Sequence, residues 1–509
     1  MELSSVYQFN VMDYGAAGNG TNSDTAAVQA AIDACAAAGG GTVYVPPGRY
    51  LIGTVCLRSN LTLHLEQGSV LIASTDKDEY RFVTVYEQCV NTTVQTGNLY
   101  GKDISNFRIT GNGEIDGADK AFWTRKETVG ESWNSVPIYY WPKEWRPMGI
   151  MLEGCSNVHI EAVTIRSSPL YSGWLIDCQR IQLRGLQILN DFHGPNTDGF
   201  HFSSCRDVHI ADCHFLTGDD SIAIDADGIS KAENYTITNC TFNTSVNCFR
   251  IFTGLDPWFT VGSYNEVRNI SISNCSVSNA AGFLNVTADN GLIEGITVSN
   301  VTLTMEQEGT PIFIMTNKGT VRHVIVSNMT AKSNGTCVII GQPGDSIDDI
   351  VLSNILFDVA AKRKAFGIDI PDDIQGYAYH HFVPYNLYFR YAGRIRLHQV
   401  AVHWLDTELQ ESWSALKCRE IERIDIDGFS GIHAGEDSEM PALHFANVKE
   451  AWITRTRALP GTKVFLQVEG TETRDIHLSD NDLMHAGQPV KTAMDVRAEA
   501  ICERGNRTW

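Results

Sequence analysis

The dominant pattern along this chain is a short alternation of apolar and polar residues that recurs many times. Each copy has an apolar, a polar and a second apolar residue, followed by Asn or a small polar residue. Alternation with a period of two predicts a β-strand. Copies start at Asn106, Asn157, Arg180, Asp207, Tyr235, Asn269, Gly295, His323 and Asp349, with fainter copies at Arg423 and Arg474.

The spacing of these copies predicts how the strands assemble. Most successive copies lie 23 to 34 residues apart, which is typical of a solenoid whose turns bury their apolar faces by stacking. We therefore predict an all-β fold, a parallel β-helix with equivalent residues of adjacent turns about 4.8 Å apart. Cysteines recur at fixed places in the copies and are expected to stack in the interior; they are Cys155, Cys178, Cys205, Cys240 and Cys275.

The N-terminal segment follows a different pattern. Asp24 stands where it can cap a helix whose apolar stripe is Val28, Ile32 and Cys35, and the three glycines of 39–41 are expected to end it. A helix there would cover the open end of the solenoid and protect its first edge. We interpret residues 1–509 as a single β-helix domain with an N-terminal cap over about residues 1–50.

Two stretches interrupt the repeat. Residues 118–148 form an irregular insertion rich in aromatic residues, and residues 360–420 form a less regular segment that the pattern does not assign. The insertion is either a packed surface loop or one wall of a sugar cleft, because aromatic faces suit sugar rings and long insertions in repeat proteins often line the binding face. Its aromatic residues are Trp123, Trp133, Tyr139, Tyr140, Trp141 and Trp145.

The net charge restricts the classes of binding partner, and the cysteine usage indicates the cellular compartment. With 39 Lys and Arg against 60 Asp and Glu, the net charge of −21 disfavours nucleic acid and anionic membranes as partners. The 13 cysteines form no CxxC pairs, which argues against zinc and favours reduced, buried thiols. Residues 1–5 lack the start of a secretory signal. We therefore expect a cytoplasmic protein; a signal peptide removed beforehand would make it secreted.

Two acidic motifs stand out, Pro195-Asn196-Thr197-Asp198-Gly199 and Thr217-Gly218-Asp219-Asp220-Ser221. Alone, either is typical of a turn, and the second also of a calcium site. Asp198 and Asp219 are 21 residues apart, about one solenoid turn, so adjacent turns should gather three carboxyls in one patch. Crowded like charges keep at least one carboxyl protonated near neutral pH. A protonated acid beside ionised bases is the requirement of glycoside hydrolysis.

The two motifs together resemble those of the polygalacturonase-like glycoside hydrolases of family 28, which are pectin-acting, right-handed parallel β-helices. The resemblance covers about residues 8–305. It implies that Asp219 is the general acid, that Asp198 and Asp220 are the bases that hold the attacking water, and that the reaction inverts the anomeric centre. It also implies that no metal or other cofactor takes part.

The chain departs from the family pattern at two places. Asn247 stands where the family has the histidine of Gly-His-Gly, and Asn cannot titrate. The family's Arg-Ile-Lys, which grips the substrate carboxylate, is matched by residues 283–286, which hold no cation. Arg250 is the candidate substitute. We expect Asn196, Asn247 and Arg250 to bind substrate, and the losses point to an altered, non-uronate specificity.

Three functions remain open on the sequence alone. The first is an inverting glycosidase that acts on pectic or related plant oligosaccharides or polysaccharides, with exo-action suited to short imported chains. The second is a non-catalytic carbohydrate-binding β-helix that retains the aspartates. The third is a uronate lyase, whose chemistry usually needs calcium and a strong base. Each has a saccharide as its partner, and none predicts an oligomeric state.

Overall fold

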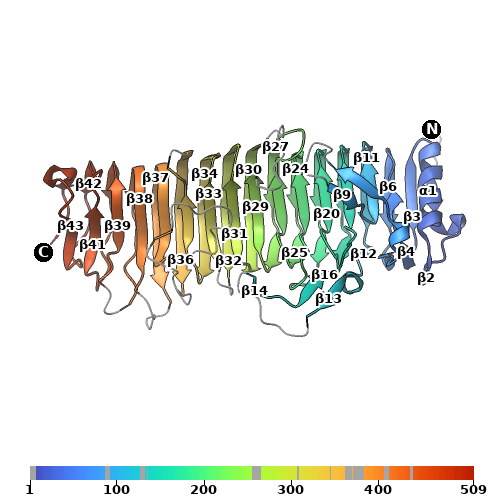
Figure 1. Cartoon of the computed structure of the whole chain (residues 1–509), viewed down its shortest axis with the longest axis horizontal. Helices are drawn as coiled ribbons and strands as arrows, with labels where there is room; N and C mark the ends of the chain where they lie inside the picture. Colours follow the sequence, from blue (N-terminus) through green and yellow to red (C-terminus); the bar gives the residue numbers. More distant parts are fainter. Residues whose placement is uncertain are drawn as a thin grey trace, which may run out of the picture. The chain divides into compact units, whose positions relative to one another are not determined.

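The computed structural model describes residues 7–85, 92–126, 132–133, 136–254, 265–305, 309–343, 346–360, 369–370, 383–405, 412–435 and 439–508. These residues are mostly in parallel β-strands. The chain forms two compact units, one of Met1–Arg250 with Asp256–Ser271 and one of Ile251–Leu255 with Ile272–Trp509. Each unit is a coil of stacked parallel strands (Figure 1).

The first unit has three columns of parallel strands, which we name A, B and C. Column A contains β1 (Gln8–Asn10), β3 (Gly41–Val45), β6 (Leu61–Leu65), β11 (Ser105–Gly111), β18 (Ser156–Glu161), β21 (Gln179–Arg184), β24 (Arg206–Ala211) and β27 (Ala232–Thr238). Column B contains β2 (Asn19–Ser23), β4 (Gly48–Ile52), β7 (Ser69–Ala73), β12 (Glu114–Asp116), β19 (Thr164–Arg166), β22 (Gln187–Leu189), β25 (His214–Thr217) and β28 (Thr241–Thr244). Column C contains β5 (Val55–Cys56), β10 (Leu99–Lys102), β17 (Ile150–Glu153), β20 (Gly173–Ile176), β23 (Phe200–Ser203), β26 (Ile222–Asp225) and β29 (Asn247–Thr253), the last of which reaches the unit boundary at Arg250.

Each turn of this coil runs from A to B to C and then begins again one rung further on. The predicted fold class, a right-handed parallel β-helix, is confirmed. Inward side chains alternate with outward ones along each strand, as in β21, where Ile181 and Leu183 are buried and their neighbours are more exposed. Apolar inward residues therefore fill the interior of the coil. A functional site can form only from the outward polar residues and from the corners between strands.

The second unit repeats the coil with longer strands. Its strands are β31 (Gly282–Ala288), β32 (Leu292–Thr304), β33 (Thr310–Thr316), β34 (Thr320–Ser333), β35 (Cys337–Ile340), β36 (Ser346–Val359), β37 (Tyr385–Trp404), β38 (Ser414–Asp427), β39 (Leu443–Val448), β40 (Ala451–Thr454), β41 (Val464–Glu469), β42 (Ile476–Ser479), β43 (Gln488–Thr492) and β44 (Ile501–Arg504), and β30 (Glu266–Asn279) crosses the unit boundary. The segment of about 360–420 contains β37 and the start of β38, and its residues 361–368, 371–382 and 406–411 lie outside the described residues.

The N-terminal helix forms where the pattern places it. Helix α1 (Thr25–Ala37) lies at the N-terminal end of the first unit (Figure 1), and its stripe of Val28, Ile32 and Cys35 is fully buried. The proposed cap is wrong in one respect, because the Asp24 side chain makes no capping hydrogen bond to the helix. Its carboxylate instead accepts the backbone N–H groups of residues 17 and 18, which fold back over it.

Cysteine and asparagine side chains recur at fixed places of the turns. The described cysteines are free, and all but Cys502 are buried, which confirms interior thiols for that part of the chain. At the outer corners, asparagines adopt left-handed backbone conformations, which Asn tolerates better than most residues. Their amides bond from rung to rung: Asn106 donates to Asn60 at 2.9 Å, and Asn157 donates to Asn106 at 2.9 Å. The second unit has its own ladder of Asn274, Asn300, Asn328 and Asn354.

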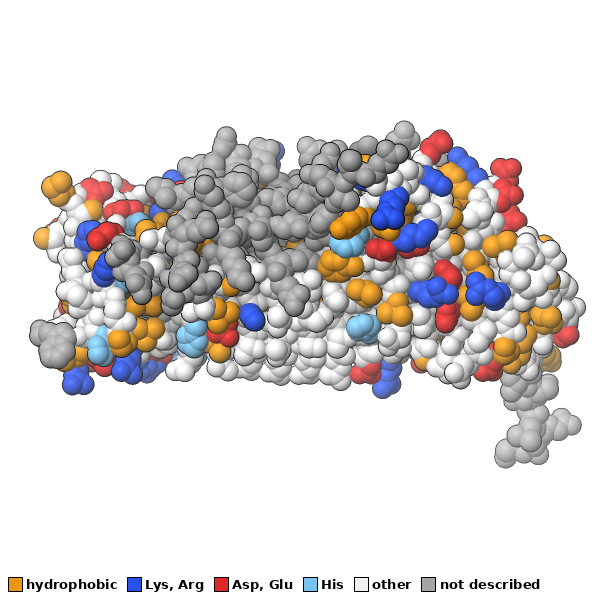
Figure 2. All heavy atoms as spheres, turned by 90° about the horizontal axis from the view of Figure 1, so that it is seen from below, with side chains coloured by type: hydrophobic (Ala, Val, Ile, Leu, Met, Phe, Trp, Pro, Cys, Tyr) orange, Lys and Arg blue, Asp and Glu red, His pale blue; other side chains and the backbone are white. Residues whose placement is uncertain are grey.

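Charges on the surface are mixed. On the face drawn in Figure 2, acidic and basic side chains are interspersed among the coloured residues, without an extended patch of one sign. Among the described residues, no helix has the length and apolarity needed to cross a membrane.

Candidate active site

The three aspartates lie at successive corners between columns B and C. Asp198 is in the corner from β22 to β23, and Asp219 and Asp220 are in the corner from β25 to β26. Since β23 and β26 pair in register, the two corners belong to adjacent turns. One carboxylate oxygen from each aspartate lies within 4.8 Å of the others. The structure therefore brings together the three carboxyls that the sequence spacing placed in one patch.

The polar residues of the two motifs build the corners. The Thr197 hydroxyl donates to the Gly194 carbonyl and accepts the Gly218 N–H at 3.0 Å. The Thr217 hydroxyl donates to the Asp219 carbonyl at 2.8 Å. A Cβ on Gly218 would lie 2.5 Å from backbone carbonyl oxygens, so this position requires glycine. The motifs are thus turns, and these turns aim the acidic side chains.

Burial and mutual repulsion set the protonation of the cluster. Asp198 is 5 % exposed and Asp220 is 2 % exposed, whereas Asp219 is half-buried. Burial and then the neighbouring Asp220 charge raise the pKa of Asp219 to about 7, with Arg250 acting in the opposite direction. Burial, followed by the charges of the other two aspartates, also raises the pKa of Asp198 well above its usual range. The cluster therefore retains a proton near neutral pH.

The three candidate binding residues all contact the aspartates. The Asn247 amide donates to Asp220 at 2.7 Å, and the Arg250 guanidinium donates to the other oxygen of Asp220 at 3.4 Å. The Asn196 amide donates to Asp219 at 3.4 Å. Their roles toward a substrate remain predictions. In the structure, each is a hydrogen-bond donor that stabilises an ionised carboxylate.

The same three aspartates are the residues that could hold a cation. In the described part of the chain, they are the only group of three or more His, Cys, Asp or Glu residues with this proximity. Calcium takes six to eight oxygen ligands, and three carboxylates supply only part of such a shell. The expectation of metal-free chemistry remains a prediction from the resemblance.

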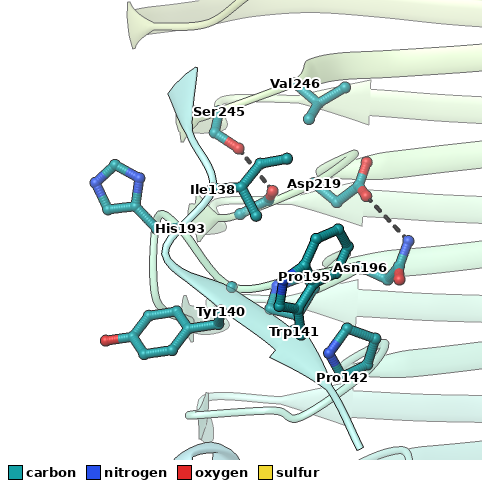
Figure 3. Close-up of a pocket in the computed structure, with 12 residues that line it drawn as sticks. Ile138, Tyr140, Trp141, Pro142, His193, Pro195, Asn196, Asp219, Ser245 and Val246 are labelled. Atoms are coloured by element: carbon teal, nitrogen blue, oxygen red, sulfur yellow. Dashed lines mark hydrogen bonds between the residues drawn. The ribbon is translucent and has the colours of Figure 1, made fainter. Parts of the chain in front are cut away.

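The aromatic insertion forms one wall beside Asp219. It leaves the coil between β12 and β17, which is the same B-to-C corner at earlier turns of the coil. A cavity of about 310 Å³ lies there (Figure 3), lined by Ile138, Tyr140, Trp141, Pro142, His193, Gly194, Pro195, Asn196, Gly218, Asp219, Ser245 and Val246. Tyr140 and Trp141 project to opposite sides of β16 (Tyr140–Pro142), with Trp141 on the side of Asn196. The Trp133 side chain lies outside the described residues.

Described residues of the insertion also pack against the coil, as the interpretation of a packed surface loop expects, whereas its role as a wall of a sugar cleft stays a prediction. The Trp123 indole N–H donates to the Pro169 carbonyl at 2.9 Å. Lys120 forms an ion pair with Asp191 and lies 4.1 Å from the centre of the Tyr140 ring. Since Asp191 begins the corner that carries Asp198, these contacts fix the insertion relative to the carboxylates.

Sequence reasoning missed several residues around the aspartates. Tyr171, one corner below Asp198, stacks obliquely on His201 with ring centres 5.2 Å apart. His201 Nε2 lies 2.6 Å from an Asp225 carboxylate oxygen. Arg146, near the end of the insertion, contacts Asn196. Tyr171, His201 and Asp225 share a place in the repeat, because each lies in a B-to-C corner or in the column C strand that follows it, whereas Arg146 belongs to the irregular insertion.

The outward face of column C is covered on the N-terminal side of the site. One outward ladder, aligned by strand register, consists of Cys56, Tyr100, Met151, Trp174 and His201. The first three are buried in an apolar cluster with Val83 of the hairpin β8 (Phe82–Val85) and β9 (Thr92–Gln95). Trp174 packs against this cluster at its edge. Along this ladder, the covered apolar surface therefore ends at Trp174, and the next residue, His201, is polar.

The fold and the carboxylate cluster define a class of protein, a parallel β-helix with acid/base groups on adjacent turns. A family model, described as glycosyl hydrolases family 28, matches residues 35–333. This chain belongs to that family, and the expected enzyme class, a glycosidase, is confirmed.

Individual relatives extend the comparison. A probable polygalacturonase of Vitis vinifera is 30% identical over 224 residues, which cover 42% of this chain and 43% of the relative, less than half of its length. An exopolygalacturonase of Zea mays is 23% identical over 361 residues, covering 68% of this chain and 76% of the relative. The structure of a family 28 exopolygalacturonase from Yersinia enterocolitica has a TM-score of 0.53 at 18% identity, covering 88% of this chain and 78% of that chain, and supports the fold.

Proposed function

We propose that this chain is an inverting, exo-acting glycosidase that hydrolyses pectic or related plant oligosaccharides and polysaccharides. The observation that carries the proposal is the contrast within the aspartate cluster. Asp219 is the more exposed carboxyl, and its pKa is raised to about 7, so it can donate a proton to the leaving oxygen. Asp198 and Asp220 are buried beside it.

The burial of these two carboxyls favours attack by water. A retaining enzyme needs a carboxylate that bonds directly to the anomeric carbon. Asp198 and Asp220 are almost inaccessible, so a small water molecule reaches them more easily than a sugar ring does. The oxygen separation of at most 4.8 Å is shorter than the ~6.5–9.5 Å between carboxyl groups in most inverting enzymes. The anomer that is released first therefore tests this part of the proposal.

Electrostatics support a substrate other than plain polygalacturonate. Two arginines lie near the cluster: Arg250 is paired with Asp220, and Arg146 is hydrogen-bonded to the Pro169 and Pro195 carbonyls and to Asn196. A charge shared with an aspartate attracts a uronate carboxylate less strongly than the bidentate arginine that such recognition usually uses. We propose a non-uronate pectic residue at the cleavage position.

Exo-action is supported by the covered part of column C. A polysaccharide lying along its outward face would meet the apolar cluster of Tyr100, Met151 and Val83 beyond Trp174. This obstruction favours binding of a chain end. The exopolygalacturonase name of the Zea mays relative agrees with this choice.

Product analysis tests these features together. We expect kcat/KM to be at least about tenfold higher on rhamnogalacturonan or neutral pectic oligosaccharides than on polygalacturonate, since one lost charged contact costs about 1.5–3 kcal/mol. Proton NMR should show the inverted anomer first, and small products should form without an early fall in viscosity. Retention, rapid viscosity loss or preference for polygalacturonate would each contradict the corresponding part of the proposal.

The pH profile should report the proton held by the cluster. Because the pKa of Asp219 is raised to about 7, the acid is protonated below that pH and loses its proton above it. We expect kcat/KM to fall about tenfold for each pH unit above the pKa of Asp219, which forms the alkaline limb of the profile. A profile that stays flat to pH 9, measured with a stable enzyme, would remove Asp219 from the acid role.

A further inference from the structure

Arg146 connects the aromatic insertion to the corner that carries Asp198. It lies between β16 and β17, and the residue is half-buried. Nη1 donates to the Pro195 carbonyl at 2.6 Å and to the Pro169 carbonyl at 3.2 Å. Nη2 donates to the Asn196 side-chain oxygen at 3.1 Å. One side chain thus bridges two successive corners and the amide beside the acid.

The donor-only chemistry of arginine decides how the Asn196 amide is oriented. A guanidinium has no acceptor, so the amide must turn its oxygen toward Arg146. Its NH₂ group then faces Asp219, to which it donates at 3.4 Å. If the amide were reversed, its oxygen would face the carboxylate, which is unfavourable whenever Asp219 is ionised. The orientation of the donor to Asp219 therefore depends on Arg146.

Arg146 also places a positive charge near the cluster. The ionisable groups that interact with it are Tyr171, Asp198 and Asp219, and Arg250 and Asp220 interact with the same carboxylates. Removal of this charge should make ionisation of the aspartates less favourable.

We propose that Arg146 is a positioning residue for the acid, which orients Asp219 through Asn196 and limits how firmly the cluster holds its proton. The proposal rests on the proposed hydrolase function for its kinetic consequence, but not for its structural one. The insertion then has two roles, because it lines the cavity and also supplies a charged group to the catalytic corner.

The test compares Arg146→Gln, which removes the charge, with Arg146→Lys, which keeps the charge but lacks the planar fork. We expect both variants to lose about 10–100-fold in kcat with KM changed less than about threefold, because a misplaced group slows the chemical step more than binding. The apparent pKa of the alkaline limb of the pH profile should rise by about half a unit or more in Arg146→Gln, and by less in Arg146→Lys. Arg125→Gln is the matched control, since it removes an exposed arginine of the same insertion.

A second measurement needs no substrate. Infrared difference titration of each protein against its Asp219→Asn counterpart reports the protonation of Asp219, and we expect a higher pKa in Arg146→Gln than in the wild type. If wild-type protein hydrolyses none of the saccharides, the proposed function fails, and this titration still decides the role of Arg146. An unchanged Asp219 pKa in folded Arg146→Gln, or kcat within twofold of wild type in both variants, would overturn the proposal.

Discussion

Asp219→Asn is expected to lower kcat on the best substrate by about a thousandfold, within the range that general acid catalysis supplies. Asn has the shape of Asp but no proton of suitable acidity for a leaving oxygen. The variant should also be more stable than the wild type at neutral pH. Since the folded-state pKa of Asp219 is raised, ionisation costs stability as pH rises from the unfolded value of about 4 toward 7, and Asn avoids that cost.

The control is Asp207→Asn, which makes the same replacement at a distant corner of the coil. Asp207 has a left-handed backbone, and its carboxylate accepts a hydrogen bond from Asn234 at 2.9 Å, so asparagine suits the position. This variant should keep wild-type kinetics. If Asp219→Asn turns over substrate as fast as the control, the general acid must be another residue. If Asp219→Asn loses only saccharide binding, the result would support a non-catalytic role for Asp219.

Phe242→Ala is expected to lower the free energy of unfolding by about 3–5 kcal/mol. The Phe242 ring is buried between Phe215, with centres 5.1 Å apart and nearly parallel planes, and Phe249, at 5.0 Å. Alanine would leave a cavity in the rungs directly behind the aspartates. Urea unfolding followed by circular dichroism measures the change.

Phe82→Ala is the matched control, because the Phe82 ring is 52% exposed. Its removal should change stability by less than about 1 kcal/mol. Similar losses for the two variants would mean that the aromatic stack behind the site contributes little to the coil.

The fold was predictable because the repeat carries most of the information. A strand pattern that returns every turn allows only stacked coils, and the buried residues of β21 and α1 lie where the pattern placed them. The Asp24 cap was not predictable, since the backbone N–H groups it binds come from a turn that local propensity does not specify. Residues 360–420 gave no assignment, and β37 lies within them.

The candidate site was predictable for residues whose separation in sequence, about one turn of the coil, determines their distance in space. Asp198 and Asp219, one turn apart, come together because the register of β23 and β26 is fixed. Arg146 could not be placed, because it belongs to an irregular insertion whose path depends on tertiary packing. His201 and Asp225 were within reach of the same phase argument that located the aspartates, had it been applied to the strand as well as the corner.

The asparagine ladders have a consequence for the changes in length that this coil can accommodate. Along each ladder, an amide at one corner bonds to an equivalent amide on the next rung, so successive junctions within a ladder resemble one another. A whole winding could be duplicated or deleted within a ladder while each remaining amide of that ladder finds a partner of the same kind. Length can therefore change in steps of one winding at positions away from the aspartates, and the chemistry stays where the acidic corners are.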